Sequence, residues 1–560
     1  MLVAIAIKIE VVAVSKLHRR LLTVMMVAMT AILAFAASPV MARAADAGAI
    51  TIGGDVATQY DAYQLFSATV TDKAGFDQKV ATDLAWANDA VRQAVLPVLH
   101  DAGLDSTAST AQEAAEWMNA DGHMTTALTA KLARAIVKAG AVSVALNAGT
   151  AAELPCGYWL IVADDDTIAQ NEAGTAPIMA LVGGSAVAVK PKAATPKVAK
   201  HVLEDSTDAW QKAADATVAD DLYWRLSATV PAGLTAYDTY TVQFVDTMSA
   251  GLDLSKVATS MRVYAAPGTD GGFDAIECED GNANSTPAKG WTDITSQCKV
   301  SIEGDAFTVR TGDLVAALGG ADTFTAGARV VAVYNAPLNS ACNHGIAKGN
   351  PNEVYLRYPR SPFADQSGDA GFTRTPSDDA CAYTWDLALT KRGSDGDKPL
   401  AGAVLSIADD RGRTLAADGT WDAEGKATVT TGEDGRVTVS GVDSGKLEVR
   451  ELKAPKGYTA FEGTRSVTVK AEGLDVDQVA AAKPKLTITA ESPLRADSAD
   501  GSTGSLEASL INTPTKDSLR GFMPSTGDMA MFAAAAVAVA GAVLILAALL
   551  VKGGSGNHRE

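Results

Sequence analysis

The spacing of apolar residues changes along the chain, from a helical period near the N-terminus to strict alternation further on. Within residues 45–190, two stretches with a helical period cover about 77–100 and 109–139. Strand-like stretches at 49–53 and 157–163 flank them. This mixture predicts an α+β domain in residues 45–190.

Short stretches of alternating apolar and polar residues fill the rest of the folded chain. They occur between clusters of Gly, Pro, Asn and Asp in residues 191–365 and again in 383–515. Short strands with regular turn signals are typical of β-sandwiches. The predicted fold class is therefore mainly β, with an α+β N-terminal domain followed by two immunoglobulin-like β-sandwiches in tandem.

Both ends carry apolar segments. Basic residues precede an apolar run at 21–36, and small residues around Ala44 follow it, so residues 1–44 are predicted to be a secretory signal peptide. Residues 529–551 are apolar and long enough for a transmembrane helix. The basic tail at 552–560 predicts that the bulk of the chain lies outside the cell.

Composition and charge exclude several functions. The 560-residue chain has a net charge of -19, and no basic face for binding nucleic acid is visible. Its six histidines are scattered, and we find no CxxC, HExxH or G-x-S-x-G motif. We therefore expect no cofactor, no metal site and no enzyme activity beyond the self-crosslinking discussed below.

A pentapeptide stands directly before the predicted span, within the segment 516–560, and consists of Met523, Pro524, Ser525, Thr526 and Gly527. Together with the span and the basic tail it resembles the LPxTG cell-wall sorting signal, with Met in place of Leu. The resemblance implies that a sortase cysteine attacks the carbonyl of Thr526 and passes the acyl group to an amine. The chain would then be a sortase substrate, secreted, held briefly by its membrane span and attached covalently to the cell wall.

Three polar residues fall on apolar strand faces in the C-terminal sandwich. Lys391 shares a face with Leu387 and Leu389, and Glu451 and Asn512 lie on similar faces. Burying them is costly and calls for a reason. One interpretation is a buried salt bridge with an amide partner, or strand ends that reach solvent. The other is a spontaneous Lys–Asn isopeptide bond, in which burial keeps the amine neutral and the acid protonated.

Sequence resemblance supports the second interpretation. Residues 451–458 resemble the E-box of Gram-positive pilins, and 398–403 resemble the start of the collagen-adhesin (Cna) B-type domain. The resemblance implies that Lys391 is the amine, Asn512 the amide and Glu451 the proton shuttle.

The middle sandwich repeats the pattern with Lys200, Asp246 and Asn352 on apolar faces. Asn350 is a competing amide, but its spacing to the following apolar residues is less favourable. The surrounding segments are similar to the middle domain of backbone pilins, in which an aspartate is the acid. This resemblance implies a second bond, Lys200–Asn352, with Asp246 as the shuttle.

A possible linking lysine lies between the first two domains. Residues 187–192 resemble the V-x-V-Y-P-K motif of pilins, which implies that Lys192 accepts Thr526 of the next subunit. Lys190 replaces the tyrosine of the motif, so either lysine can be the acceptor.

Five cysteines enter an oxidising compartment. Cys278 and Cys298 fall within one loop-rich insertion and are predicted to form a disulfide. Cys342 and Cys381 can clip the middle domain to the last one, and Cys156 is left over, but spacing does not fix the pairing.

The leading hypothesis is a structural subunit of a covalently polymerised surface pilus that supports adhesion. Its expected partners are a sortase, other copies of itself, and peptidoglycan or a basal pilin, with a host ligand left open. The alternative is a wall-anchored adhesin that remains monomeric. The sequence does not identify the sortase, nor does it distinguish a backbone from an accessory subunit.

Overall fold

The computed structural model describes residues 47–515, apart from 54–57, 75, 77, 192–193, 276–277, 280–281 and 284–286. Several predicted features lie outside the described residues, namely the predicted signal peptide at 1–44, Lys192, the motif Met523 to Gly527, the predicted span at 529–551 and the tail. None of the described helices is long and apolar enough to cross a membrane.

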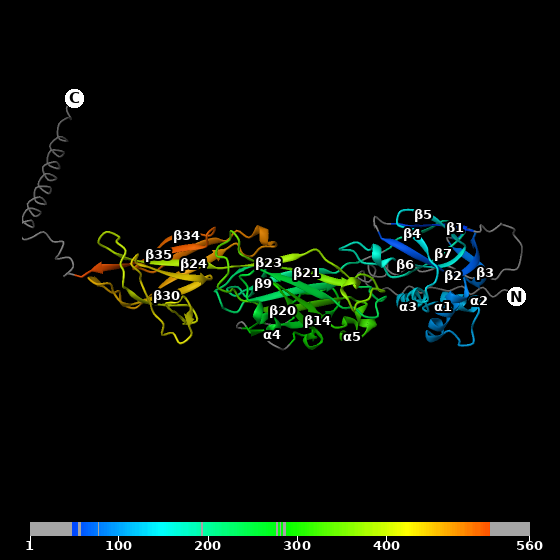
Figure 1. Cartoon of the computed structure of the whole chain (residues 1–560), viewed down its shortest axis with the longest axis horizontal. Helices are drawn as coiled ribbons and strands as arrows, with labels where there is room; N and C mark the ends of the chain where they lie inside the picture. Colours follow the sequence, from blue (N-terminus) through cyan, green and yellow to red (C-terminus); the bar gives the residue numbers. More distant parts are fainter. Residues whose placement is uncertain are drawn as a thin grey trace, which may run out of the picture.

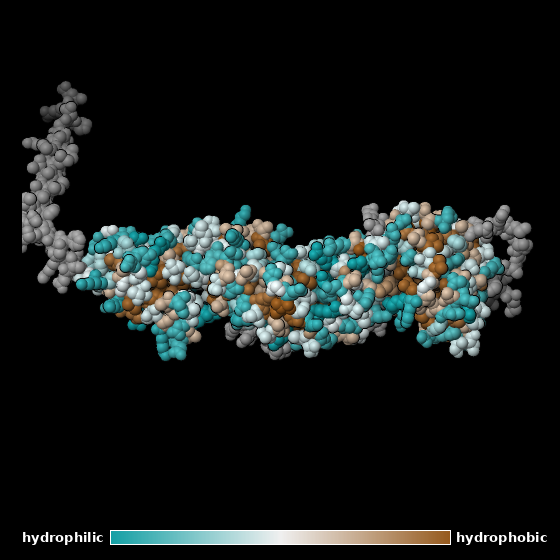
Figure 2. All heavy atoms as spheres, in the orientation of Figure 1, coloured by the Kyte–Doolittle hydropathy of each residue, from teal (hydrophilic) through white to brown (hydrophobic). Residues whose placement is uncertain are grey.

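The molecule is elongated, with three β-rich parts in a row (Figure 1). The N-terminal part carries the three long helices, and the other two parts are built almost wholly from strands, which confirms the mainly β class. On the face drawn in Figure 2, hydrophilic and hydrophobic residues are interspersed along all three parts.

The N-terminal part combines two sheets with three helices. One sheet has the order β3-β2-β6-β7 with β4 beside β2, and the other has the order β5-β1-β8. The strands are β1 (Ala47–Ile52), β2 (Gln59–Asp72), β3 (Lys79–Trp86), β4 (Val144–Asn147), β5 (Ala151–Pro155), β6 (Gly157–Ala163), β7 (Ile178–Val182) and β8 (Val187–Val189). The helices are α1 (Asp89–Asp101), α2 (Ala111–Asn119) and α3 (Thr126–Lys138).

Helix boundaries here differ from the sequence prediction. The first predicted helix begins too early and includes strand β3. Helix α1 begins only at Asp89, because the side chain of Asn88 accepts a hydrogen bond from Val91 N and caps the helix there. The second predicted helix is split in two, and Gly122 with positive φ lies in the break. Each helix still buries one apolar face, such as Val91, Val95 and Leu99 of α1.

The middle part is a sandwich of two large sheets. One has the order β10-β9-β12-β20-β14-β17, and the other β11-β23-β21-β13-β19-β18 with β22 beside β21. The strands of the first are β9 (Lys197–Glu204), β10 (Ala209–Gln211), β12 (Tyr223–Val230), β14 (Arg262–Pro267), β17 (Thr292–Asp293) and β20 (Ala328–Asn335). The strands of the second are β11 (Ala213–Asp215), β13 (Gln243–Met248), β18 (Lys299–Glu303), β19 (Ala306–Arg310), β21 (Asn350–Pro359), β22 (Phe372–Arg374) and β23 (Asp378–Tyr383).

Short elements complete the middle part, namely α4 (Val257–Ser260), α5 (Leu314–Ala317), α6 (Ala321–Phe324), β15 (Cys278–Glu279) and β16 (Asn282–Ala283). The predicted end of this domain at residue 365 is too early, because β22 and β23 pair with β21 in the same sheet. The Pro- and Gly-containing segment after β21 is a loop within the domain and not a linker.

The C-terminal part is a second sandwich. Its first sheet has the order β29-β24-β35-β31 with β34 beside β35, and its second has β27-β26-β25-β30-β32-β33 with β28 beside β25. The first contains β24 (Trp385–Gly393), β29 (Arg436–Val442), β31 (Tyr458–Thr459), β34 (Leu494–Asp500) and β35 (Ser505–Pro514). The second contains β25 (Val404–Ala408), β26 (Thr414–Leu415), β27 (Trp421–Asp422), β28 (Val429–Thr430), β30 (Gly445–Lys453), β32 (Thr464–Glu472) and β33 (Lys485–Ala490).

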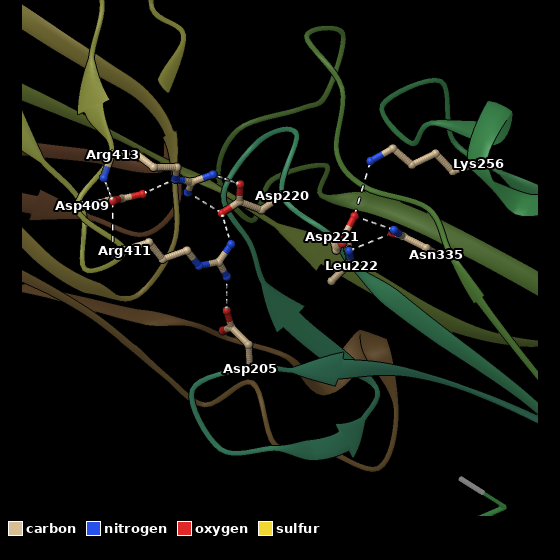
Figure 3. Close-up of polar contacts among 9 residues, drawn as sticks. All are labelled: Asp205, Asp220, Asp221, Leu222, Lys256, Asn335, Asp409, Arg411 and Arg413. Carbon is tan, nitrogen blue, oxygen red and sulfur yellow. Dashed lines mark hydrogen bonds and ion pairs between the residues drawn. The ribbon is translucent and has the colours of Figure 1, made fainter. Parts of the chain in front are cut away.

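Ion pairs join the two sandwiches. Asp220 of the middle part accepts from Arg411 at 3.0 Å and from Arg413 Nη2 at 2.7 Å, and Arg413 also donates to Asp409 (Figure 3). The buried Asp215 accepts from Trp385 Nε1 at 2.6 Å. Because these partners come from both sandwiches, they hold the two parts in a defined relation.

Candidate functional site

The three polar residues singled out in the C-terminal sandwich come together in its core. Lys391 lies on β24, Glu451 on β30 and Asn512 on β35, and their exposed fractions are 0%, 6% and 2%. β24 and β35 are parallel neighbours, in which Lys391 is opposite Leu510 and Gly393 is opposite Asn512. The alternative that these strand ends reach solvent is wrong, because all three side chains are buried.

Glu451 lies between the other two side chains. Asn512 Nδ2 donates to Glu451 Oε1 at 2.8 Å and to Oε2 at 3.0 Å. Lys391 Nζ is 3.8 Å from Glu451 Oε1 and donates to the carbonyl oxygen of Leu510 at 3.1 Å. The carbonyl oxygen Oδ1 of Asn512 is buried without a hydrogen-bond partner in the structure.

Burial lowers the pKa of Lys391 from its ordinary 10.5 to about 8, although the charge of Glu451 opposes this shift. A lysine with this pKa is a neutral amine far more often than a surface lysine at the same pH. Neutral amines are nucleophiles, so the cluster holds a nucleophile, an acid and an amide carbon within one apolar pocket.

The second cluster lies in the core of the middle sandwich. Lys200 is on β9 in one sheet, while Asp246 on β13 and Asn352 on β21 belong to the other sheet. All three are fully buried. Strand β21 is not the last strand of this sandwich, since β22 and β23 follow it, so Lys200 and Asn352 lie on the first strand and an interior strand.

A tyrosine hydroxyl completes this cluster. Lys200 Nζ is in direct contact with Asp246 Oδ2 and lies 2.9 Å from Tyr334 Oη. Asn352 Nδ2 donates to the same Oη at 2.8 Å, and Oη lies 3.2 Å from Asp246 Oδ2. The remaining oxygens, Asp246 Oδ1 and Asn352 Oδ1, are buried without hydrogen-bond partners.

Burial shifts the pKa values of both ionisable partners toward their neutral forms. The pKa of Lys200 falls to about 8 because of burial, against the opposing charge of Asp246. The pKa of Asp246 is raised by burial, against the charge of Lys200 and the hydrogen bonds from Lys200 and Tyr334. A neutral amine beside a protonated acid is the state that amide formation requires.

The structure also separates the two candidate amides of the middle domain. Asn350 is buried too, but its Oδ1 accepts from Asn343 N and its Nδ2 donates to the carbonyl oxygens of Asn343 and Ala382. Asn350 therefore anchors a loop, while Asn352 lies in the lysine cluster.

The sequence pattern did not identify Tyr334 as a member of the cluster. Tyr334 is the second-last residue of strand β20, in which almost every residue on both faces is buried, so alternation does not single out one position. An aromatic residue in such a strand is usually part of the core. Only its spatial neighbours reveal its role.

The other predicted sites are only partly described. Lys190 is exposed directly after β8, and Lys192 lies outside the described residues. Cys298 is a free thiol here, and the side chain of Cys278 is not described, so their disulfide stays a prediction. Cys342 and Cys381 are also free thiols in this structure. Among the described residues, no group of three or more His, Cys, Asp or Glu side chains is placed to hold a metal ion.

Comparison with known proteins agrees with the resemblances seen in the sequence. Residues 386–483 match the family model described as SpaA, a prealbumin-like fold domain. The "Trypsin-resistant surface T6 protein" of Streptococcus pyogenes serotype M6 is 30% identical over 143 residues, which are 24% of this chain and 24% of the relative. The match thus spans about a quarter of that relative's length.

Two solved structures that are similar to this chain are pilins. The T6 backbone pilin of serotype M6 Streptococcus pyogenes has a TM-score of 0.45 at 16% identity, covering 84% of this chain and 98% of that one. The full-length major pilin SpaD from Corynebacterium diphtheriae has a TM-score of 0.40 at 14% identity, with the same coverage. Residues 386–483 thus match the SpaA prealbumin-like fold domain, and a 143-residue part of the chain is similar to the streptococcal T6 surface protein.

Proposed function

We propose that this protein is the structural subunit of a covalently polymerised surface pilus, stiffened by two internal Lys–Asn isopeptide bonds. The observation that carries the proposal is the pair of buried clusters, each with one lysine, one acid and one asparagine, in successive sandwiches. One buried lysine beside an acid is explained by a salt bridge. Two such lysines, each with a nearby asparagine whose carbonyl oxygen is unpartnered, favour a bond-forming arrangement.

The bond forms without any external enzyme. The neutral Nζ of the lysine attacks Cγ of the asparagine, and the protonated acid gives its proton to Nδ2. The Cγ–Nδ2 bond breaks, ammonia leaves, and the ionised acid takes a proton from the attacking nitrogen. A new amide joins the lysine and asparagine side chains, and each bond lowers the mass of the chain by one ammonia.

The two bonds constrain the sandwiches in different ways. Lys391–Asn512 ties the first strand of the C-terminal sandwich to its last strand, which is its parallel neighbour. Lys200–Asn352 ties one sheet of the middle sandwich to the other. By analogy with disulfides, closing loops of about 150 and about 120 residues stabilises each sandwich by about 5 kcal/mol in the chain-entropy model.

The assembly step uses the two ends of the subunit. A sortase cleaves after Thr526 and transfers that residue to Lys192, or to Lys190, of the next subunit; the last subunit is passed to peptidoglycan or a basal pilin. This part of the proposal rests on the sorting motif and on residues 187–192. The similarity to a surface protein named for its trypsin resistance is in keeping with an internally crosslinked chain.

A wall-anchored adhesin that stays monomeric is the second candidate, since it shares every feature except use of the linking lysine. Analysis of wall extracts from the native bacterium distinguishes the pilus subunit from the monomeric adhesin. A polymeric pilus gives a ladder that resists boiling in detergent, together with a peptide in which Thr526 is joined to Lys192. A Lys192→Arg variant collapses the ladder, and Lys190→Arg is its matched control. A single wall-bound species with no Thr526–lysine peptide would contradict the pilus proposal.

A further inference from the structure

The hydroxyl of Tyr334 lies within hydrogen-bond distance of all three members of the middle cluster. Its Oη is 2.9 Å from Lys200 Nζ, 2.8 Å from Asn352 Nδ2 and 3.2 Å from Asp246 Oδ2. The ring is 1% exposed and packs edge-to-face on Phe307, with 4.9 Å between ring centroids. Packing therefore fixes where the hydroxyl lies.

The hydrogen bonds match what a phenol can make. A tyrosine hydroxyl has one proton to donate and two lone pairs that accept. Nζ of Lys200 and Nδ2 of Asn352 are donors, so both lone pairs accept from them. The single hydroxyl proton is then directed at Asp246 Oδ2, which leaves a continuous path from the acid to the amide nitrogen.

The C-terminal cluster explains why the middle one needs this hydroxyl. Glu451 reaches Asn512 Nδ2 directly, at 2.8 Å and 3.0 Å. Asp246 is one methylene shorter, and the amide nitrogen of Asn352 donates to Tyr334 instead. The phenol thus stands where the longer acid would otherwise make its contact.

We propose that Tyr334 is a catalytic residue of the Lys200–Asn352 bond, acting as the proton relay between Asp246 and the amide nitrogen that leaves as ammonia. The inference rests on the proposed isopeptide bond and assigns a role at that site. It applies to the middle cluster, since at the C-terminal cluster the acid touches the amide itself.

The relay balances within the cluster. Nζ of Lys200 attacks Cγ of Asn352, and Tyr334 gives its hydroxyl proton to Nδ2 while it takes the proton held by the neutral Asp246. The ionised Asp246 then takes a proton from Nζ. The Cγ–Nδ2 bond breaks, ammonia leaves, and the tyrosine and the aspartate end in the states in which they began. Burial raises the pKa of Tyr334 well above its ordinary value, so the phenol passes a proton on without remaining ionised.

The test is the rate of bond formation in Tyr334→Phe. This change removes one oxygen and keeps the ring that packs on Phe307. The full mature chain is made by cell-free synthesis and quenched at intervals in acid and urea. Peptide mapping then measures the Lys200–Asn352 and Lys391–Asn512 bonds in the same molecules, so the C-terminal bond is an internal control. Tyr240→Phe is the matched variant, because Tyr240 is equally buried in the same core.

We expect Tyr334→Phe to slow the Lys200–Asn352 bond by roughly 100-fold, a typical loss for one proton-transfer group. In Tyr334→Phe the Lys391–Asn512 bond should form at the wild-type rate. In Tyr240→Phe both bonds should form at wild-type rates. Thermal melting of Asn352→Ala, with and without Tyr334→Phe, measures the effect of the tyrosine change on stability when the bond cannot form. Equal melting temperatures would show that Tyr334→Phe slows the reaction and does not weaken the fold.

Two results would overturn the inference, and they are distinguishable. If the Lys200–Asn352 bond forms at the wild-type rate in Tyr334→Phe, the proposed role of the tyrosine is wrong, but the proposal of two isopeptide bonds is unaffected. Absence of both bonds in the wild-type chain overturns the proposed function itself, and the relay with it.

Discussion

Lysines are rarely buried, and Lys200 and Lys391 are both fully shielded from solvent. Each has a pKa lowered to about 8, because burial penalises the charged amine more than the neighbouring acid compensates. If either lysine remained an amine, the folded state would bear that penalty at neutral pH. Conversion to an uncharged amide removes the titrating group and the penalty together.

This gives a pH prediction for Asn512→Ala, in which Lys391 remains an amine. Its pKa is about 8 when folded and near 10.5 when unfolded, so the unfolded state binds the extra proton between these values. The free energy of unfolding of the variant should therefore rise by about 3 kcal/mol as the pH increases from about 8 to 10.5. Below pH 8 the variant bears the whole cost of burying the charged amine. Denaturant titrations of variant and wild type measure the difference. A difference that does not change with pH would contradict the buried-amine account.

The acid gives a second residue-scale prediction. Glu451→Gln keeps the shape of the side chain and removes the proton shuttle, so the Lys391–Asn512 bond should form roughly 100-fold more slowly or not at all. The Lys200–Asn352 bond is unaffected. Peptide mapping of the purified chain measures both. Glu448→Gln is the control, because Glu448 lies on the same strand and pairs with Lys446 at the surface. A normal amount of the Lys391–Asn512 bond in Glu451→Gln would exclude the assigned role.

At the scale of strands, side-chain alternation was enough to find both clusters. Six residues each share a strand face with apolar residues at spacing two, and each is buried, namely Lys391, Glu451, Asn512, Lys200, Asp246 and Asn352. The same rule failed for Tyr334, because β20 is buried on both faces. It also failed at the end of the middle domain, where the three-residue β22 is too short to show a pattern and both β22 and β23 pair with β21.

The crosslinks should stabilise the sheets that they join. Asn352→Ala removes the tie between the two sheets of the middle sandwich and costs about 5 kcal/mol, mainly by freeing the unfolded chain. For a domain of this size the melting temperature should fall on the order of 10–20 °C. Scanning calorimetry measures the middle transition. Asn339→Ala is the control, since that amide donates to the Ala250 carbonyl and accepts from Ala341 N near the surface, and its change should be far smaller. Equal melting of the two variants would contradict a covalent tie.

At the scale of the whole molecule, the parts form a row whose shape depends on the junctions between them (Figure 1). Asp220 is the central acceptor of one junction and is only 11% exposed, so removing it leaves the guanidinium groups of Arg411 and Arg413 without their shared partner (Figure 3). In the proposed pilus, such junctions would transmit force along the shaft without hinging.

Asp220→Ala should therefore loosen the middle–C-terminal junction by about 2 kcal/mol and leave both isopeptide bonds in place. Small-angle scattering would record a broader distribution of molecular dimensions, and proteolysis would cleave faster near β23. Glu424→Ala removes an exposed pair with Lys426 and is the matched control. Unchanged scattering in Asp220→Ala would mean that β-strand contacts alone hold the junction.

The central claim is that the two buried clusters react to form bonds, and intact mass of the secreted, folded chain tests it most directly. The account predicts a mass lower by two ammonia molecules than the sequence gives. Tryptic peptides joined through Lys200–Asn352 and Lys391–Asn512 would locate the losses, and Asn352→Ala or Asn512→Ala would each restore one. A chain of full sequence mass with both lysines free would contradict the account and reduce the clusters to buried salt bridges.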